Sequence, residues 1–492
     1  MRAAGAGQGT GPGSRNGADL ASEDGRGTGT GPADLVASLD EAPLGRVHLR
    51  AVVASGVGFF TDAYDLFVIG IASALIAKDW DLSAGRLAVL NSTMLGAACL
   101  GAFVFGRYAD KVGRKRVYWL VAVIMIVGAF GSSVSGSFWM LIAFRFALGF
   151  GVGGDYPVSA VVVSEYANRK DRGKLVGMVF GTQALGLVVG PLVALALLGS
   201  GIDASVTWRV LLGLGAIPAA AVLYLRLRMP ESPRYQAQVR NRAVGAAATS
   251  VGLPRPALPP AGPREFLTSR RWLVTLAGTA GCWFLLDYAY YGNTISTPQI
   301  LGLISPAASA TTKIAMQLAI FVVAAVPGYV LAIARLDRIG HRKLQFIGFA
   351  GMAMCFAVIA AVPGMTTAVV PFLLVYGVSY FFTEFGPNMT TFVLPSELFP
   401  IGMRATGHGI SAGVGKLGAF IGVFLFPLLQ TSLGLRGTLL LTAAVSAAGL
   451  ALTLVLPEPA GRSLDDIAAP RRADAGPAPG AVPQPAVTRR QA

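Results

Sequence analysis

Apolar runs recur along the whole chain and are separated by short polar breaks. Each run has about the 20 residues that a helix needs to cross the hydrocarbon core of a bilayer. We therefore interpret them as membrane spans rather than as buried helices of a soluble core. The predicted spans lie near 48–77, 85–106, 117–136, 138–160, 173–199 and 207–227, and near 272–300, 312–334, 343–363, 367–392, 405–428 and 437–456.

Two short motifs occur once in each half of the chain. Asp110 and Gly113 follow the second span, and Asp337 and Gly340 follow the eighth at the same spacing. A Ser-Glu pair with an arginine seven residues beyond the glutamate also occurs in both halves. This internal repeat predicts an all-α membrane protein with twelve transmembrane helices in two six-helix bundles.

The segments outside the spans are rich in small residues, proline and scattered charge, without a continuous apolar run. Such composition cannot bury a core, so we expect disordered cytoplasmic tails at both ends. The predicted organisation is a tail at 1–45, a six-helix bundle at 46–228, a central cytoplasmic loop at 229–270, a second six-helix bundle at 271–457 and a tail at 458–492.

Composition and charge place the helices in lipid. Hydrophobic residues make up 54% of the chain and charged residues 13%, with a mean hydropathy of +0.61; soluble domains are about a quarter charged. The net charge of +15 raises the possibility of a nucleic-acid partner. However, Lys and Arg concentrate in the tails and in one set of loops, which predicts that both termini are cytoplasmic in a multi-pass plasma (cell inner) membrane protein. The opposite loops hold Lys78, Arg86, Arg209, Lys313 and Arg436.

No cofactor, metal or nucleic acid is expected, and the protein is not expected to be an enzyme. Cys99, Cys282 and Cys355 fall in apolar segments without the spacing of metal ligands. Residues 149–154 contain G-x-G-x-x-G, but no strand precedes them, and residues 413–416 lack the first glycine of a P-loop. We expect the glycines of 149–154 to permit close helix packing.

The repeated motifs place acids and bases at one end of the spans. Together they can form a charge network that holds the two bundles closed, although any single Lys or Arg there also serves as a positive-inside anchor. The expected cytoplasmic gating network is Asp110, Arg114, Glu165, Arg172, Asp337, Glu397 and Arg404. Segments 106–116, 230–234 and 457–464 resemble motifs of the major facilitator superfamily, and the last two of these motifs are shared with sugar transporters.

Few ionisable side chains fall inside the predicted spans, and each is a functional candidate because a charge at bilayer depth is costly. Several carboxylates accompany a single lysine. If these side chains converge from different spans, they form a polar cavity. Such a cavity suits an anion that arrives with protons, since a buried carboxylate must be neutral or paired. The candidates are Asp62, Asp65, Asp155, Asp287, Glu384 and Lys416, with the neutral Tyr156, Gln183, Trp283, Tyr291 and Asn388.

Segment 153–160, followed by Ser164 and Glu165, closely resembles the signature of the phosphate:proton symporter family within this superfamily. Segments 62–65 and 283–292 are similar to that family too, and the usual Leu of the signature is Val158 here. The resemblance implies phosphate contacts by Tyr156, Gln183, Trp283, Asp287, Tyr291, Asn388 and Lys416, with Asp62, Asp65 and Asp155 on the proton path.

Other polar residues receive plainer interpretations. Arg145 is expected to pair with a fixed carboxylate or carbonyl rather than with substrate. His48, His341 and His408 lie at span ends, where a solvated histidine is expected. Glu384 receives no role from the resemblance.

The predicted function is proton-coupled import of inorganic phosphate by alternating access, with phosphate, protons and membrane lipid as partners and a monomeric state. Asp287 is expected to select phosphate over sulfate, because dihydrogen phosphate carries O–H donors and sulfate carries none. Two alternatives remain. One is a symporter of the same fold for an organic acid or sugar, and the other is a transporter-like nutrient sensor that binds without transport.

Overall fold

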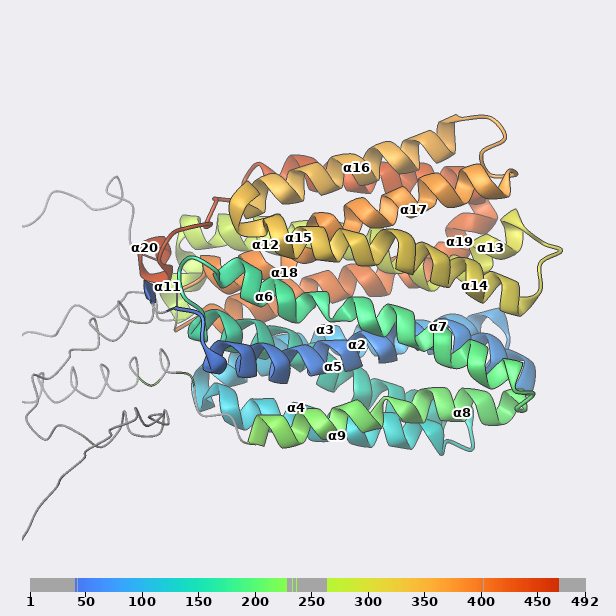
Figure 1. The fold of residues 1–492 in the computed structure, drawn as a ribbon, viewed down its shortest axis with the longest axis horizontal. Coiled ribbons are helices and arrows are strands. Elements are labelled where there is room, and N and C mark those ends of the chain that lie inside the picture. Colours follow the sequence, from blue (N-terminus) through green and yellow to red (C-terminus); the bar gives the residue numbers. More distant parts are fainter. Residues whose placement is uncertain are drawn as a thin grey trace, which may run out of the picture.

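The computed structural model describes residues 40, 41, 43–227, 232, 236, 263–400 and 402–468. Residues 1–39 of the first predicted tail, 469–492 of the second and 237–262 of the central loop lie outside these residues, as does segment 230–234 apart from Ser232. Residues 458–468, predicted as the start of the second tail, are described and include the short helix Leu464–Ala468. The described helices run side by side along the long axis of the molecule (Figure 1).

The first half supplies six spans. Three of them are α2 (Arg46–Asp79), α3 (Ala84–Val112) and α4 (Arg114–Ser133), and the fourth is α5 (Phe138–Tyr166). The fifth span is α6 (Arg172–Gly181) continued by α7 (Gln183–Gly199), and the sixth is α8 (Ala204–Leu214) continued by α9 (Ala216–Leu227).

The second half repeats this plan. The seventh span is α12 (Arg270–Ile295) with α13 (Thr297–Ile304). The eighth combines α14 (Ala310–Ile320), the π-helical η2 (Phe321–Ala325) and α15 (Val326–Ile339), and the ninth is α16 (His341–Ala361). The tenth is α17 (Val369–Phe385) with α18 (Pro387–Leu398), and α19 (Arg404–Thr453) supplies the last two. The short helices α11 (Pro263–Thr268) and α20 (Leu464–Ala468) both lie at one end of the molecule (Figure 1).

The number of spans follows from the break in the last long helix. Within the described residues, ten helices are long and apolar enough to cross a membrane. One of them, α19, contains two spans, because Gly434 adopts a non-helical conformation with φ 67° and turns the chain back. The polar-rich α12 runs parallel to the other spans (Figure 1) and completes the twelve. The expected all-α architecture of twelve transmembrane helices is confirmed.

Several helices are longer than the apolar runs that predicted them. The predicted second span ended at residue 106 and the tenth at 392, whereas α3 continues to Val112 and α18 to Leu398. Apolar periodicity ends where the lipid would end, but the helices continue into a region rich in charge. We call this region the Arg/Lys-rich end. It consists of the last turns of α3, α5, α15 and α18 and the first turns of α4, α6, α16 and α19.

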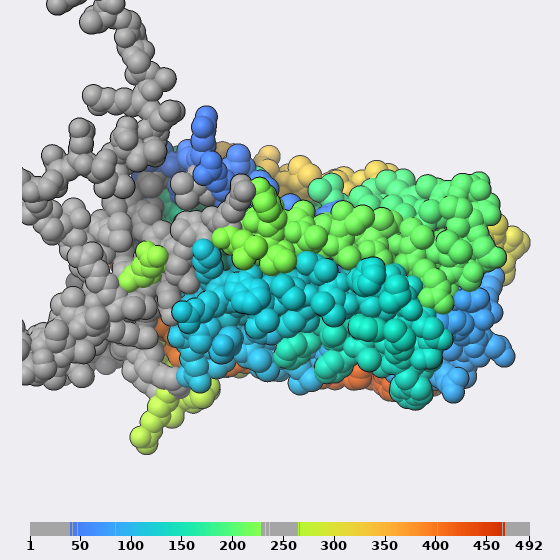
Figure 2. Space-filling view, turned by 90° about the horizontal axis from the view of Figure 1, so that it is seen from below, coloured from blue at the N-terminus to red at the C-terminus, as the bar shows by residue number. Residues whose placement is uncertain are grey.

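Glycines allow the spans of the first bundle to pack backbone against backbone. A Cβ added at Gly149 of α5 would lie 2.2 Å from the carbonyl oxygen of Met94 in α3, and one at Gly153 would lie 2.0 Å from that of Ala98. The predicted packing role of the glycines in 149–154 is confirmed. The outer face of this bundle, formed by α4, α5 and α9 (Figure 2), exposes large apolar side chains such as Trp139 and Ile217, as a lipid-facing surface should.

The described ends of the chain lie at the same end of the molecule. The Ser463 hydroxyl donates a hydrogen bond of 2.8 Å to the Asp40 carboxylate. An even number of spans requires this arrangement. The charge-based expectation that both termini share one side therefore agrees with the fold.

Candidate functional site

A buried lysine lies where the two bundles meet. The Lys416 ammonium, on α19, donates hydrogen bonds of 3.0 Å to Asp287 Oδ2 and 3.0 Å to the Tyr291 hydroxyl, both on α12. It also lies 4.4 Å from the ring centroid of Tyr156 on α5 and 4.3 Å from that of Tyr291. One carboxylate and two aromatic faces thus offset the cost of burying this charge.

A chain of hydrogen bonds leads from this lysine across both bundles. The Tyr156 hydroxyl lies 3.4 Å from that of Tyr291 and accepts a 3.0 Å hydrogen bond from Gln183 Nε2. The Tyr329 hydroxyl donates to Gln183 Oε1 at 3.4 Å, and Asn388 Nδ2 donates to the Tyr329 hydroxyl at 2.9 Å. Tyr156 and Gln183 come from the first bundle and the others from the second.

Two breaks in helices position the amides of this chain. Gln183 is the first residue of α7, directly after the break that separates α6 from α7. Asn388 is the second residue of α18, behind the Gly386-Pro387 break after α17. Interrupted helices near the membrane midplane are a common way for transporters to build a polar site.

Aromatic rings close one side of the site. The Trp283 ring centroid lies 6.1 Å from that of Tyr156 and 6.3 Å from that of Phe392. His408 packs perpendicular to Trp283 with centroids 5.5 Å apart. The structure therefore brings together all seven residues predicted as substrate contacts: Tyr156, Gln183, Trp283, Asp287, Tyr291, Asn388 and Lys416.

The three aspartates predicted for proton coupling have different surroundings, although all are fully buried. Asp155 forms an ion pair of 2.5 Å with Arg226 and accepts a hydrogen bond from Ser159. Asp65 is adjacent to Arg145, whose guanidinium donates to the Asp65 backbone carbonyl at 2.9 Å. Within the described chain, neither carboxylate oxygen of Asp62 or Asp65 has a hydrogen-bond partner.

Sequence reasoning missed Arg226 and Tyr329. Arg226 lies inside the apolar run of the sixth span. A charged residue inside such a run is itself a sign of a functional position. Nothing in the local pattern around Tyr329 distinguishes it from a packing residue. Its place in the hydrogen-bond chain depends on how α15 is rotated against α7 and α18.

At the Arg/Lys-rich end, a first cluster joins α3, α4 and α5 to α19. Arg114 forms ion pairs with Asp110 at 3.1 Å and with Glu165 at 3.0 Å. Asp110 also accepts two hydrogen bonds of 2.7 Å from the backbone N–H and hydroxyl of Thr406, in the other bundle. Arg404 lies 3.7 Å from Glu165.

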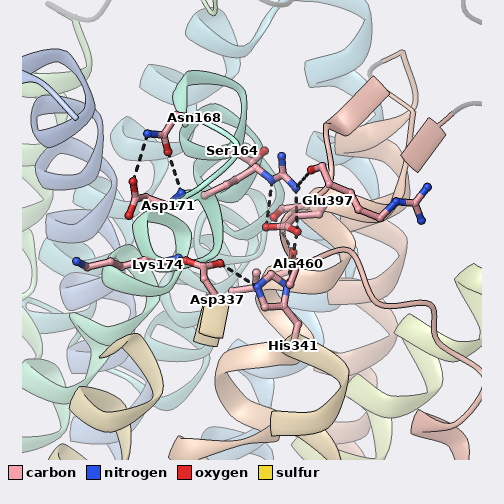
Figure 3. A network of polar contacts seen from close by, with 12 residues as sticks. Ser164, Asn168, Asp171, Lys174, Asp337, His341, Glu397 and Ala460 are labelled. Atoms are coloured by element: carbon pink, nitrogen blue, oxygen red, sulfur yellow. Dashed lines mark hydrogen bonds and ion pairs between the residues drawn. The ribbon is translucent and has the colours of Figure 1, made fainter. Parts of the chain in front are cut away.

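A second cluster joins α6 to α15, α16 and α18 (Figure 3). Arg172 forms an ion pair of 3.2 Å with Glu397, and the Lys174 backbone N–H donates to Asp337 at 2.7 Å. His341 lies between the two acids, with Nε2 3.2 Å from Asp337 and Nδ1 3.5 Å from Glu397. All seven residues of the predicted gating network thus lie in two clusters, and each cluster joins one bundle to the other.

Two histidines correct a sequence expectation. His341 and His408 are fully buried, whereas solvated side chains were expected. His341 starts α16 and lies within the second cluster, and His408 lies inside α19, where its Nε2 is 3.1 Å from the Phe392 carbonyl oxygen. The span-end rule failed because packing covers both side chains: His341 lies against Gly173 of the opposite bundle, and His408 is enclosed by Phe392 and Trp283 of its own bundle.

Two six-helix halves around a shared polar site, closed by charge clusters at one end, are the architecture of a membrane transporter built from repeats. The model of the Major Facilitator Superfamily matches residues 56–415. The chain is 36% identical to inorganic phosphate transporter 1-6 of Oryza sativa subsp. japonica over 88% of its length and 95% of the relative. It is 35% identical to the probable inorganic phosphate transporter 1-6 of Arabidopsis thaliana, over 88% of the chain and 96% of that protein.

Among solved structures, the proton:xylose symporter XylE bound to 6-bromo-6-deoxy-D-glucose superposes with a TM-score of 0.72 at 18% identity, covering 85% of this chain and 98% of the symporter. At this identity the likeness concerns the fold alone. The chain belongs to the major facilitator superfamily and, within it, to the family of these phosphate transporters.

Proposed function

We propose that this protein imports inorganic phosphate together with protons across the plasma membrane by alternating access. The observation that supports it best is the buried Lys416 between the bundles, held by Asp287 and two phenols, in a member of a family whose relatives are named inorganic phosphate transporters. As proposed, the chain is a transporter and not an enzyme.

The chemistry of the site suits dihydrogen phosphate. The Lys416 ammonium, the hydroxyls of Tyr156 and Tyr291 and the amide of Gln183 can donate hydrogen bonds to an anion, and the amide of Asn388 can do so once it leaves its present acceptors. Asp287 Oδ2 is used by Lys416, while Oδ1 has no hydrogen-bond partner in the described chain and can accept an O–H of phosphate. Trp283 would form an apolar wall.

The coupling proton would be carried in the first bundle, and we assign it to Asp62. Asp155 already has a cation, Arg226, and Asp65 is adjacent to Arg145. Asp62 has neither an ion pair nor a hydrogen bond among the described residues, so its carboxylate is best tolerated in the neutral form. Asp65 and Asp155 would then tune the proton path rather than carry the proton.

Transport requires the site to open to each side in turn. The two clusters at the Arg/Lys-rich end hold the bundles together there, and we take this end to be cytoplasmic from the bias of Lys and Arg. Release of phosphate into the cell would then require these clusters to separate. Because both bundles contribute contacts to the site, rocking one bundle against the other would lower the affinity of the site for phosphate.

The test is radiolabelled phosphate uptake into proteoliposomes with an imposed inward proton gradient. We expect gradient-dependent uptake by the wild type and at least a tenfold loss in Lys416→Ala, because removal of one partner of a buried pair costs about 3–5 kcal/mol. Lys416→Arg, which keeps the charge, should retain more activity than Lys416→Ala. Asp155→Asn should lower uptake by leaving Arg226 without its counter-ion.

The outcomes separate the alternatives. Saturable phosphate binding without flux would identify a sensor. Absence of phosphate binding, with uptake of an organic acid or sugar, would assign a different solute. Phosphate uptake that ignores the proton gradient would contradict the coupling.

A further inference from the structure

The membrane interior of the described chain holds more carboxylates than cations, and two acids are left over. Asp155 pairs with Arg226, Asp287 pairs with Lys416, and Arg145 is adjacent to Asp65. The two remaining acids are Asp62 in the first bundle and Glu384 in the second. Within the described residues, neither forms an ion pair.

Glu384 is fully buried in α17, and among the described residues no positively charged side chain acts on it. The titratable groups that face it are phenols: Tyr290 from α12, Tyr329 from α15 and Tyr380 from its own helix. A Cβ added at Gly328 of α15 would lie 3.0 Å from Glu384 Cβ, so this helix packs closely against the glutamate. A lone ionised carboxylate in such a place is costly, which favours the protonated acid.

This glutamate is bonded directly to the proposed phosphate site. Asn388 Nδ2 donates one hydrogen bond to Glu384 Oε2 and another, of 2.9 Å, to the Tyr329 hydroxyl. A side-chain amide has two N–H donors, so both are committed inside the second bundle. Asn388 in this arrangement has no N–H left for an anion.

Protonation of Glu384 would change this arrangement. A carboxylic acid can donate an O–H, whereas a carboxylate only accepts. The acid can donate to Asn388 Oδ1, which lets the amide turn its N–H groups toward the site. A proton on Glu384 therefore supplies a hydrogen-bond donor for phosphate.

We propose that Glu384 is a second proton-binding residue of the transporter, located in the C-terminal bundle, whose protonation makes Asn388 able to bind phosphate. The proposal rests on the function proposed above and adds one proton to the one assigned to Asp62. Dihydrogen phosphate would enter with a proton on each acid and leave after both acids lose their protons to the cytoplasm. Each cycle then moves two protons and one net positive charge inward.

The first experiment measures phosphate accumulation in proteoliposomes under a pH gradient of one unit with the membrane potential clamped at zero. Each coupled proton then contributes about a tenfold factor to the limiting accumulation ratio. We expect the wild type to approach the two-proton limit and Glu384→Gln, which imitates the neutral acid, to fall about tenfold lower. Glu384→Asp, which restores a titratable group, should recover part of the difference.

The second experiment starts from a protein in which Glu384 is intact, so its first measurement does not depend on the folding of Glu384 variants. Phosphate is added to purified Asp62→Asn protein in weakly buffered solution, and proton uptake is followed with a pH indicator. This variant should still take up protons when phosphate binds, whereas the double variant with Glu384→Gln should not. In addition, Glu384→Gln should keep its phosphate affinity at alkaline pH, where the wild type loses it.

Unchanged accumulation in Glu384→Gln, or no proton uptake by Asp62→Asn, would overturn the proposal. So would a folded Glu384→Gln protein that binds no phosphate at any pH, because Glu384 would then merely position Asn388. A wild type that neither binds nor transports phosphate would instead refute the proposed function itself.

Discussion

At the scale of single residues, the site depends on how buried charges share their partners. Lys416 uses one oxygen of Asp287 and leaves the other without a hydrogen bond from the described chain. This second oxygen of Asp287 can accept a hydrogen bond from a ligand that carries an O–H. A ligand without an O–H leaves it without a hydrogen bond. An unsatisfied buried acceptor costs about 1–3 kcal/mol, which is enough to discriminate between anions of similar size.

Asp287→Asn tests this discrimination. We expect sulfate to compete poorly with phosphate in the wild type and about tenfold more effectively in the variant, because the amide can donate to sulfate and no longer requires an O–H. The measurement is inhibition of radiolabelled phosphate uptake by sulfate, scaled to each protein's own uptake. Asp155→Asn serves as the matched control, since it removes a carboxylate that pairs with Arg226 and should leave selectivity unchanged. Equal competition by sulfate in the wild type would refute the role of Asp287.

At the scale of helices, close contact between glycines sets how tightly the bundles meet. Gly106 of α3 and Gly409 of α19 face each other across the bundle interface near the Arg/Lys-rich end. A Cβ added at Gly106 would lie 2.7 Å from the Ala405 carbonyl oxygen and 2.9 Å from Gly409 Cα. Because these obstacles are backbone atoms, a larger residue can be accommodated only if the helices separate.

Gly106→Val should therefore separate α3 from α19 and weaken the nearby contact of Asp110 with Thr406. We expect the variant to spend less time with the bundles arranged as they are here. Its free energy of unfolding should fall by about 1–3 kcal/mol, the usual cost of overpacking. The unfolding temperature of the purified protein in detergent measures the effect. Gly85→Val is the control in the same helix, because a Cβ added at Gly85 meets no atom within 4 Å. Equal destabilisation by the two variants would show that helix propensity alone is responsible.

At the scale of the whole molecule, the two clusters at the Arg/Lys-rich end couple the halves that the internal repeat created. Arg172 is buried and contacts Glu397 and the Arg462 backbone carbonyl of the other half. Removal of one member of a buried pair leaves its partner's charge uncompensated in the closed state, whereas opening exposes that charge to water. The clusters thus bias the molecule toward closure at this end.

Arg172→Ala should shift the molecule toward opening at this end. A cysteine introduced at Met389, which packs on Gly177 and Gly181 of the first bundle, reports the opening. We expect at least tenfold faster labelling by a membrane-impermeant maleimide applied from the Arg/Lys-rich side. Protein without the introduced cysteine measures background labelling of Cys99, Cys282 and Cys355, all of which are buried. Unchanged labelling would mean that the clusters do not hold this end closed.

The order of residues alone was enough to predict the spans, the repeat and most members of the candidate site. Span length is a local property, and Asp62, Asp287 and Lys416 stand out because charge is rare in apolar runs. Asp110 and Asp337 were found through the repeat, which needs no knowledge of packing.

The pairing of the charges, in contrast, follows from the packing of the helices in three dimensions. The pairs Asp155 with Arg226 and Asp287 with Lys416 join residues far apart in the chain, and His341 is covered in part by Gly173 of the opposite bundle. Such pairings depend on how each helix is rotated about its axis and on how the bundles dock, and apolar periodicity specifies neither. Glu384 shows the difference most clearly: its position in a span was evident, but its isolation from positive charge was visible only when the surrounding helices were in place.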